Sequence, residues 1–166
     1  YSDNRSYEVL NDYIKKLSTD KNLLLETYRD LGIVDPQSKL DDSITVKNYA
    51  SIFRALYHAS YLTQEMSDKM FSILAQSEFS EGLEAGVPKE VEVAHKFGER
   101  KIIIKNPQGQ DVRQILQFHD CGIIYYPDNP YLLCIMTRGD DTSELKSIIA
   151  QVSKMVYQEV DSRKRE

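Results

Sequence analysis

The sequence predicts an α+β fold in which a helical lobe precedes a three-stranded antiparallel sheet and one helix packed on that sheet. Two observations support this prediction. Apolar residues recur at helical spacing before Pro88, and from Val91 the pattern changes to strict alternation. A wide helical stripe returns after Thr142 and closes the chain. We expect residues 1–88 to form the helical lobe and residues 89–166 to form the sheet with its helix, around one shared core.

Four helices are expected in the first lobe. The first covers about residues 6–17, and the second ends near Leu31, where Gly32 suits a left-handed C-terminal cap. The third follows Thr45, and the fourth begins after Thr63 as its N-cap. The side chains expected to face inward are Tyr49, Ile52, Phe53 and Leu56 in the third helix and Met66, Met70, Ile73 and Leu74 in the fourth.

Three strands and a last helix are expected in the second lobe. The first strand is predicted to run from Val91 through Ile104 to a turn at residues 106–109. The second strand covers about residues 114–126, and the third covers residues 131–138. The last helix begins at Thr142 or Ser143, and its expected inward stripe is Leu145, Ile148, Ile149, Val152, Met155 and Val156.

The two cysteines lie on the second and third predicted strands. With a tight turn at residues 127–130, Ile123 would face Cys134 and Cys121 would face Met136. The cysteines would then be diagonal neighbours, which is poor geometry for a disulfide. We therefore expect two buried thiols.

Composition and charge exclude several classes of protein. The net charge of −5, without a basic stripe, argues against nucleic acid as a partner. No apolar run approaches the roughly 18 residues that a membrane span needs. The three histidines are far apart and show no Cys–His spacing, so neither a metal nor another cofactor is expected. Because the chain opens on Tyr1 without a signal-like segment, we expect it to be part of a longer protein.

The segment Val91–Arg100 contains the first candidate functional residues. Its alternation places Lys96 and Gly98 on one face of the strand, and His95 and Phe97 on the other. A cation beside bare backbone suits an anionic ligand group that must approach the main chain. On the other face, His95 is expected to be a core or interface histidine. His119 and Asp120 are adjacent and are expected to form a charged pair.

A second motif, Ser2-Asp3-Asn4, leads directly into the first helix. Together with Lys96-Phe97-Gly98, it resembles the S-D-N and K-T-G motifs of serine β-lactamases and penicillin-binding proteins, in the same order. The three predicted strands and the terminal helix extend this likeness over essentially the whole chain. The sequence therefore resembles the C-terminal two-thirds of a class A β-lactamase-like domain.

The resemblance implies a serine acyl-transfer site between the helical lobe and the sheet. Ser2 would pass a proton to the departing nitrogen, and Asn4 would hydrogen-bond the amide side chain of the substrate. Lys96 would keep the local field positive, which favours the substrate carboxylate and the proton transfer at Ser2. Gly98 would allow close approach, and the backbone N–H of Glu99 would supply one oxyanion donor.

The remaining motif residues have supporting roles in this interpretation. Asp3 would hold the turn by accepting backbone hydrogen bonds. Phe97 stands where the family has a hydroxyl residue, and its place in the alternation favours a core aromatic. Carboxylate recognition would then depend on Lys96, helped by Arg100 or Ser2.

Two further departures from the family pattern concern the nucleophile and the deacylating base. An S-x-x-K nucleophile would precede Ser2, whereas the two matches, Ser18–Lys21 and Ser143–Lys146, both follow it and are expected to be helix boundaries. We therefore expect residues 1–166 to lack the nucleophile. The loop at residues 35–43 contains no glutamate to activate a water molecule, so an acyl-enzyme would persist.

The predicted function is that of a fragment of a serine β-lactamase-like hydrolase or acyltransferase, acting on β-lactam or peptidoglycan-type amides through an acyl-enzyme. By resemblance the protein would work outside the cytoplasm, with a preceding N-terminal segment as a partner. The alternative is a non-catalytic module of the same fold that binds the cell wall or a protein partner. Phe97 and the absent glutamate favour this alternative, whereas Ser2, Asn4, Lys96 and Gly98 oppose it.

Overall fold

The computed structural model describes residues 4–17, 23–33 and 44–165. The predicted α+β order is confirmed, with a sheet of strand order β1-β2-β3 in which both pairings are antiparallel. The elements, in chain order, are α1 (Asn4–Leu17), α2 (Leu23–Asp30), α3 (Val46–Tyr57), α4 (Gln64–Leu74), the 3-10 turn η1 (Glu84–Gly86), β1 (Val93–Lys105), β2 (Asp111–Ile124), β3 (Tyr131–Gly139) and α5 (Thr142–Arg165).

The helix boundaries follow from capping side chains. The Thr45 hydroxyl accepts a hydrogen bond from the Asn48 N–H at 3.1 Å, and Thr63 caps α4 in the same way. Gly32 has a φ of 67°, a conformation that glycine adopts without strain after a helix. An Asp141 carboxylate oxygen accepts from the Glu144 N–H at 3.0 Å and opens α5. The predicted starts of α3, α4 and α5 are therefore confirmed.

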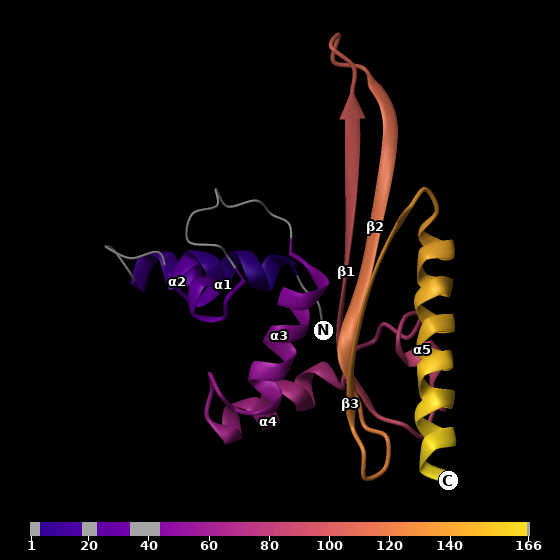
Figure 1. Ribbon diagram of the computed structural model, residues 1–166. Coiled ribbons are helices and arrows are strands. Elements are labelled where there is room, and N and C mark those ends of the chain that lie inside the picture. The colour runs from indigo at the N-terminus through magenta and orange to yellow at the C-terminus, as the bar shows by residue number, and fades with distance from the viewer. Residues whose placement is uncertain (1–3, 18–22, 34–43, 166) are drawn as a thin grey trace.

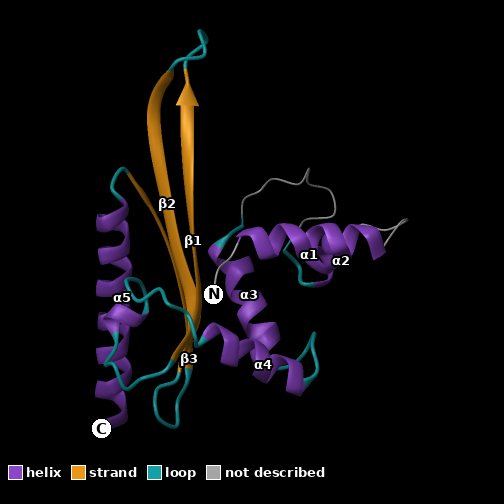
Figure 2. Cartoon of the chain, turned by 180° about the vertical axis from the view of Figure 1, so that it is seen from behind, coloured by secondary structure: helices purple, strands orange, loops and turns teal. Residues whose placement is uncertain are grey.

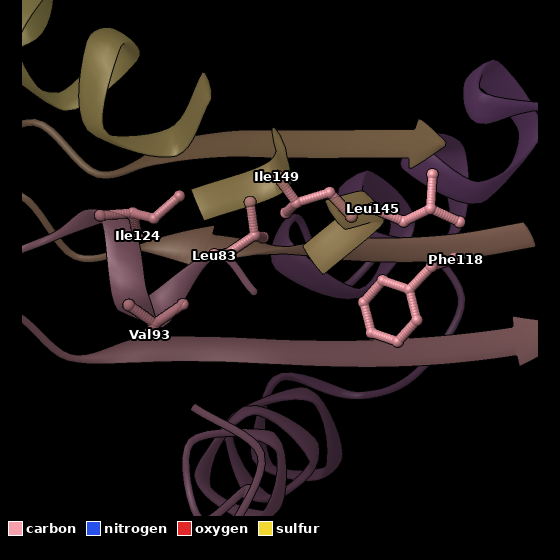
Figure 3. Close-up of a cluster of buried hydrophobic side chains, with 6 residues drawn as sticks. All are labelled: Leu83, Val93, Phe118, Ile124, Leu145 and Ile149. Atoms are coloured by element: carbon pink, nitrogen blue, oxygen red, sulfur yellow. The ribbon is translucent and has the colours of Figure 1, made fainter. Parts of the chain in front are cut away.

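The two faces of the sheet are covered by different helices. Helix α5 packs on one face, and α3 and α4 pack on the other (Figure 1). Figure 3 shows the cluster on the α5 side, where the buried side chains are Leu83, Val93, Phe118, Ile124, Leu145 and Ile149. The cluster on the opposite side consists of Phe53, Phe71, Ala94, Cys121 and Ile123. The sheet is therefore the middle layer between two apolar clusters.

Several predicted inward-facing residues are exposed instead. Met66 and Ile73 of α4 are 48% and 43% exposed, and Met155 of α5 is 69% exposed. The buried positions of α4 are Ser67 and Phe71, because Phe71 packs against rings of α3. Apolar spacing alone gave a stripe that is wider than the contact each helix makes.

The prediction of two buried thiols is wrong. Ile124 pairs with Tyr131, so the connection covers residues 125–130 instead of 127–130. This shifts the register by two residues and places Cys121 directly opposite Cys134, with a Cα–Cα distance of 4.0 Å. The two sulfur atoms form a disulfide between neighbouring strands. Turn length sets the register of a hairpin, and this turn is longer than its Pro-Asp-Asn-Pro sequence indicates.

Reducing this disulfide should lower the free energy of unfolding by about 3 kcal/mol, since it closes a short loop in the unfolded chain. The two cysteines are 13 residues apart. Urea unfolding of the oxidised and reduced protein measures the difference. A Cys121→Ser/Cys134→Ser variant should match the reduced protein. Identical unfolding midpoints for the oxidised and reduced forms would contradict the prediction.

Strands β1 and β2 continue as a two-stranded ribbon past the end of β3 (Figures 1 and 2). Pairing with β3 begins only at Leu116 of β2. The ribbon closes at the predicted turn, where Gly109 has a φ of 80° and the Asn106 side chain accepts from two backbone N–H groups. Among the described helices, none is long and apolar enough to cross a membrane.

Candidate active site at the edge of the K-x-G strand

Lys96 lies on the outer strand of the sheet, on the face that carries α3 and α4. The predicted alternation is confirmed, because Ala94 belongs to the α3 and α4 cluster whereas Val93 and Phe97 pack on the α5 side. In the described part of the chain, β1 has no neighbouring strand on its outer edge. The Lys96 Nζ donates to the Phe97 carbonyl oxygen at 2.5 Å and lies 4.8 Å from the Phe97 ring centre.

The environment of Lys96 changes its acidity. Burial lowers the pKa of the ammonium group, and the charge of Asp120 partly offsets this effect. Lys96 therefore gives up its proton more readily than a solvated lysine does. This property suits a cation that takes part in proton transfer as well as in anion binding.

A cavity of about 310 Å³ lies beside this strand edge, between β1 and the end of α4. Lys96 and Phe97 line it from the strand, and Ser77, Glu78 and Phe79 line it from the segment after α4. Ser77 and Glu78 were not predicted as site residues, because they belong to no motif and only folding brings them to the strand edge. Ser77, Glu78 and Lys96 therefore line one cavity.

Tyr49 of α3 joins the helical lobe to the K-x-G strand. Its hydroxyl donates to the Lys96 carbonyl oxygen at 2.7 Å. Burial raises the pKa of the Tyr49 hydroxyl, and the Asp120 charge adds to the effect, so the group remains a donor at ordinary pH. The sequence predicted Tyr49 as an inward-facing residue but gave no sign of this hydrogen bond.

Gly98 provides room for His119 of the neighbouring strand. The two residues are directly paired, and a Cβ at position 98 would overlap Nε2 of His119. The His119 ring also packs edge-on against Tyr49, with 5.4 Å between ring centres. Position 98 therefore needs a glycine to make room for the His119 ring, a requirement that the sequence did not predict. It also adds His119 to the face that carries Lys96.

The predicted pair of His119 and Asp120 is wrong. Adjacent residues of a strand point to opposite faces, so Asp120 lies on the α5 side, buried beside His95. His95 Nδ1 is 2.9 Å from one carboxylate oxygen of Asp120, and the Leu83 N–H donates to the other at 2.9 Å. The expectation that His95 is a core residue is confirmed, since it is 1% exposed.

His119 should titrate below the ordinary histidine range. Burial lowers its pKa, the Lys96 charge lowers it further, and Asp120 opposes the shift. The folded protein thus binds this proton less well than the unfolded chain. The His119 contribution to stability should be complete above pH 6.5 and decline as the pH falls from there toward the folded pKa. An NMR titration of the ring protons measures the midpoint, and a value above 6.5 would contradict the prediction.

The other predicted site residues either lie outside the described residues or are exposed. Ser2 and Asp3 lie outside the described residues, as do residues 35–43 and the Ser18–Lys21 match. Asn4 begins α1 and is exposed, and the described interactions include none between Asn4 and Lys96. Glu99 and Arg100 continue β1 and are exposed.

Phe97 and Lys146 both contribute to the α5 side of the sheet. Phe97 stacks on Phe79, with 4.2 Å between ring centres, and on Phe118, which confirms it as a core aromatic. In the second Ser-x-x-Lys match, the Lys146 ammonium donates to Glu81 at 3.1 Å. Lys146 also lies over the Phe79 and Phe118 rings, away from the face that carries α3 and α4.

The order of elements agrees with known proteins. A sequence model described as the β-lactamase enzyme family matches residues 1–160. The chain belongs to the β-lactamase enzyme family. No curated protein sequence matches the chain.

Solved structures of β-lactamases and of a penicillin-binding protein share this fold. A structure of PBP-A matches with a TM-score of 0.63 and 20% identity, over 84% of this chain and 51% of that chain. A β-lactamase from Sphaerobacter thermophilus matches with a TM-score of 0.63 and 16% identity, over 89% of this chain and 56% of that one. This member of the β-lactamase family thus spans about half the length of the structures that it matches.

Proposed function

We propose that the protein is a serine hydrolase or acyltransferase that acts on a β-lactam or peptidoglycan-type amide through an acyl-enzyme. One observation carries the proposal: in a chain of the β-lactamase family, Lys96 lies at an open strand edge beside a cavity of about 310 Å³. One similar structure, of a PBP-A variant, is described as an acyl-enzyme complex with penicillin G. A substrate of this class would place its carboxylate near the Lys96 ammonium group.

The direction of the backbone groups of β1 supports Glu99 as an oxyanion donor. The Tyr125 N–H donates to the Glu92 carbonyl. The backbone N–H and C=O groups of Glu92, and of every second residue after it, therefore point toward β2. The residues between them, including Phe97 and Glu99, then direct theirs out of the open edge. The Phe97 carbonyl accepts a hydrogen bond from the Lys96 ammonium group, which agrees with an outward direction of the Phe97 carbonyl. The Glu99 N–H would therefore point toward a substrate that lies along β1.

The Ser2-Asp3-Asn4 motif would form the opposite wall of the site. In this proposal Ser2 protonates the leaving nitrogen, Asn4 holds the substrate amide, and Asp3 fixes the turn before α1. Arg100 assists with the substrate carboxylate in place of the hydroxyl that Phe97 lacks. Residues 1–88 and 89–166 then act as two lobes of one domain, with the site between them.

Neither Ser-x-x-Lys match within the chain is the nucleophile in this proposal. Lys146 is paired with Glu81 on the α5 side, so it cannot also activate a serine beside Lys96. The nucleophile then comes from a segment outside residues 1–166, which is the expected partner of this chain. Residues 35–43 contain no glutamate, so deacylation is slow. We place the protein outside the cytoplasm, where peptidoglycan is found.

A non-catalytic module that binds the cell wall or a protein partner is the second candidate. Phe97 favours it, because the side chain of the middle motif position is packed between rings instead of reaching a ligand. Such a module would bind a peptidoglycan-like ligand at the same strand edge without a covalent step.

Labelling with a fluorescent penicillin tests the proposal. The full-length protein should acquire one covalent label, seen as the mass of the intact penicillin added to the chain, and the label should be lost slowly. Residues 1–166 alone should stay unlabelled, with or without Ser143→Ala. Reversible binding without any label would favour the non-catalytic module. Labelling of residues 1–166 at Ser143 would show that the nucleophile is misassigned.

A further inference from the structure

A cavity of about 670 Å³ lies at the start of β1, between the sheet and helices α3 and α4. Its chemical character comes from two tyrosines and two acidic residues: Tyr57 at the end of α3, Tyr125 after β2, Asp68 of α4 and Glu92 before β1. None of the described residues that line it also lines the cavity beside Lys96. The reaction proposed for the edge of β1 therefore does not use this second cavity.

Strand pairing brings Glu92 and Tyr125 together. Val93 pairs with Ile124, and the Tyr125 N–H donates to the Glu92 carbonyl at 3.0 Å, so the antiparallel ladder continues for one more pair. Directly paired residues share a face of the sheet. Because Tyr125 packs against the apolar cluster under α3 and α4, the Glu92 side chain is directed to that side as well.

Helix α4 brings Asp68 to the same cavity. Gln64, Asp68 and Ser72 recur at intervals of four residues, so they form one row along the helix, and all three line the cavity. The Gln64 amide donates to an Asp68 carboxylate oxygen at 2.8 Å and so orients that carboxylate. Phe71 of the same helix packs edge-on against Tyr57, with 6.1 Å between ring centres, and holds the tyrosine ring in the wall.

The cavity combines aromatic rings with negative charge. Burial raises the pKa of the Tyr125 hydroxyl. The Glu92 charge, the Tyr57 hydroxyl and the Asp68 charge raise this pKa further, so all three groups lie close to one phenol. The described residues that line the cavity include no lysine, arginine or histidine. Within the described chain, neither Asp68 nor Glu92 forms an ion pair, so their negative potential is available to a cation.

We propose that this cavity binds an alkylammonium group of a ligand. An ammonium group donates hydrogen bonds to carboxylates, and the face of a tyrosine ring attracts the same positive charge. Leu56 and Phe71 supply apolar surface for the methylene groups that carry the ammonium. A metal ion suits the cavity less well, because the described residues contain no group of three or more side chains that could hold one.

NMR titration of the protein with n-butylamine, and separately with Nα-acetyl-lysine methylamide, tests the proposal at pH 7 and constant ionic strength. At least one of the two should bind saturably and shift the ring signals of Tyr57 and Tyr125. Glu92→Gln should weaken that binding about fivefold, because it removes one of the two carboxylates. Glu90→Gln is the matched control, since Glu90 is an exposed carboxylate that does not line the cavity, and its replacement should leave binding unchanged.

The two ligands distinguish the source of the ammonium group. Tighter binding of the blocked lysine assigns a lysine side chain of a peptide, whereas equal or tighter binding of n-butylamine assigns a small amine. Absence of saturable binding by both would overturn the proposal. Equal weakening by Glu92→Gln and Glu90→Gln would also overturn it, because that result describes general charge attraction and not a site.

Discussion

Replacing Lys96 with alanine should lower the rate constant for acylation of the full-length protein by penicillin about 10²- to 10³-fold. The ammonium group lies at the open edge of β1 beside the cavity, partly withdrawn from water, where a charge acts more strongly than it does in solvent. Its loss removes the cation that would hold the substrate carboxylate and favour proton transfer at the site. Stopped-flow measurement of covalent labelling gives the rate constant.

Lys101→Ala is the control for this prediction. Lys101 is an exposed lysine of the same strand that points to the other face, so its replacement should leave the rate unchanged. Lys96→Arg should retain part of the activity, because the charge remains while its geometry changes. Because the Lys96 pKa is lowered, the rate should fall on the alkaline side at a pH below 10.5. Equal rates for Lys96→Ala and Lys101→Ala would exclude a role for Lys96 in the reaction.

Replacing Asp120 with alanine should lower the free energy of unfolding by about 3–5 kcal/mol. The carboxylate is 0% exposed, and it satisfies both the His95 ring and the Leu83 N–H. Without it, two buried polar groups lose their partner, and a cavity opens between β1, β2 and the segment before η1. Urea unfolding followed by circular dichroism measures the loss.

Asp120→Asn separates the two causes of this loss. The amide keeps an oxygen for the Leu83 N–H and nearly the same volume, so the variant should lose less stability than Asp120→Ala. Asp140→Ala, at an exposed aspartate after β3, should change the unfolding free energy by less than about 0.5 kcal/mol. A loss for Asp120→Ala no larger than that for Asp140→Ala would show that the buried pair does not stabilise the fold.

Local signals in the sequence were sufficient for most of the fold. Thr45 and Thr63 specified helix starts because a side-chain oxygen at an N-cap acts within three residues. The alternation around Lys96 specified which strand face each residue occupies, since backbone geometry fixes that period. Gly32 and Gly109 marked the ends of elements at positive φ.

The candidate site was predictable only in part, because a sequence motif shows only residues that are close together in the chain. Lys96, Gly98 and Phe97 are neighbours in the chain, so a motif could reveal them. Ser77, Glu78 and Tyr49 reach the same strand edge from other elements, and no spacing in the sequence records that approach.

The sequence by itself determined the order of elements, the capped helix ends and the faces of β1, because each depends on interactions between residues close in the chain. Only the tertiary structure decided the pairing of Cys121 with Cys134 and of His95 with Asp120. These contacts depend on register between strands. A change of two residues in one connection alters every cross-strand partner beyond it.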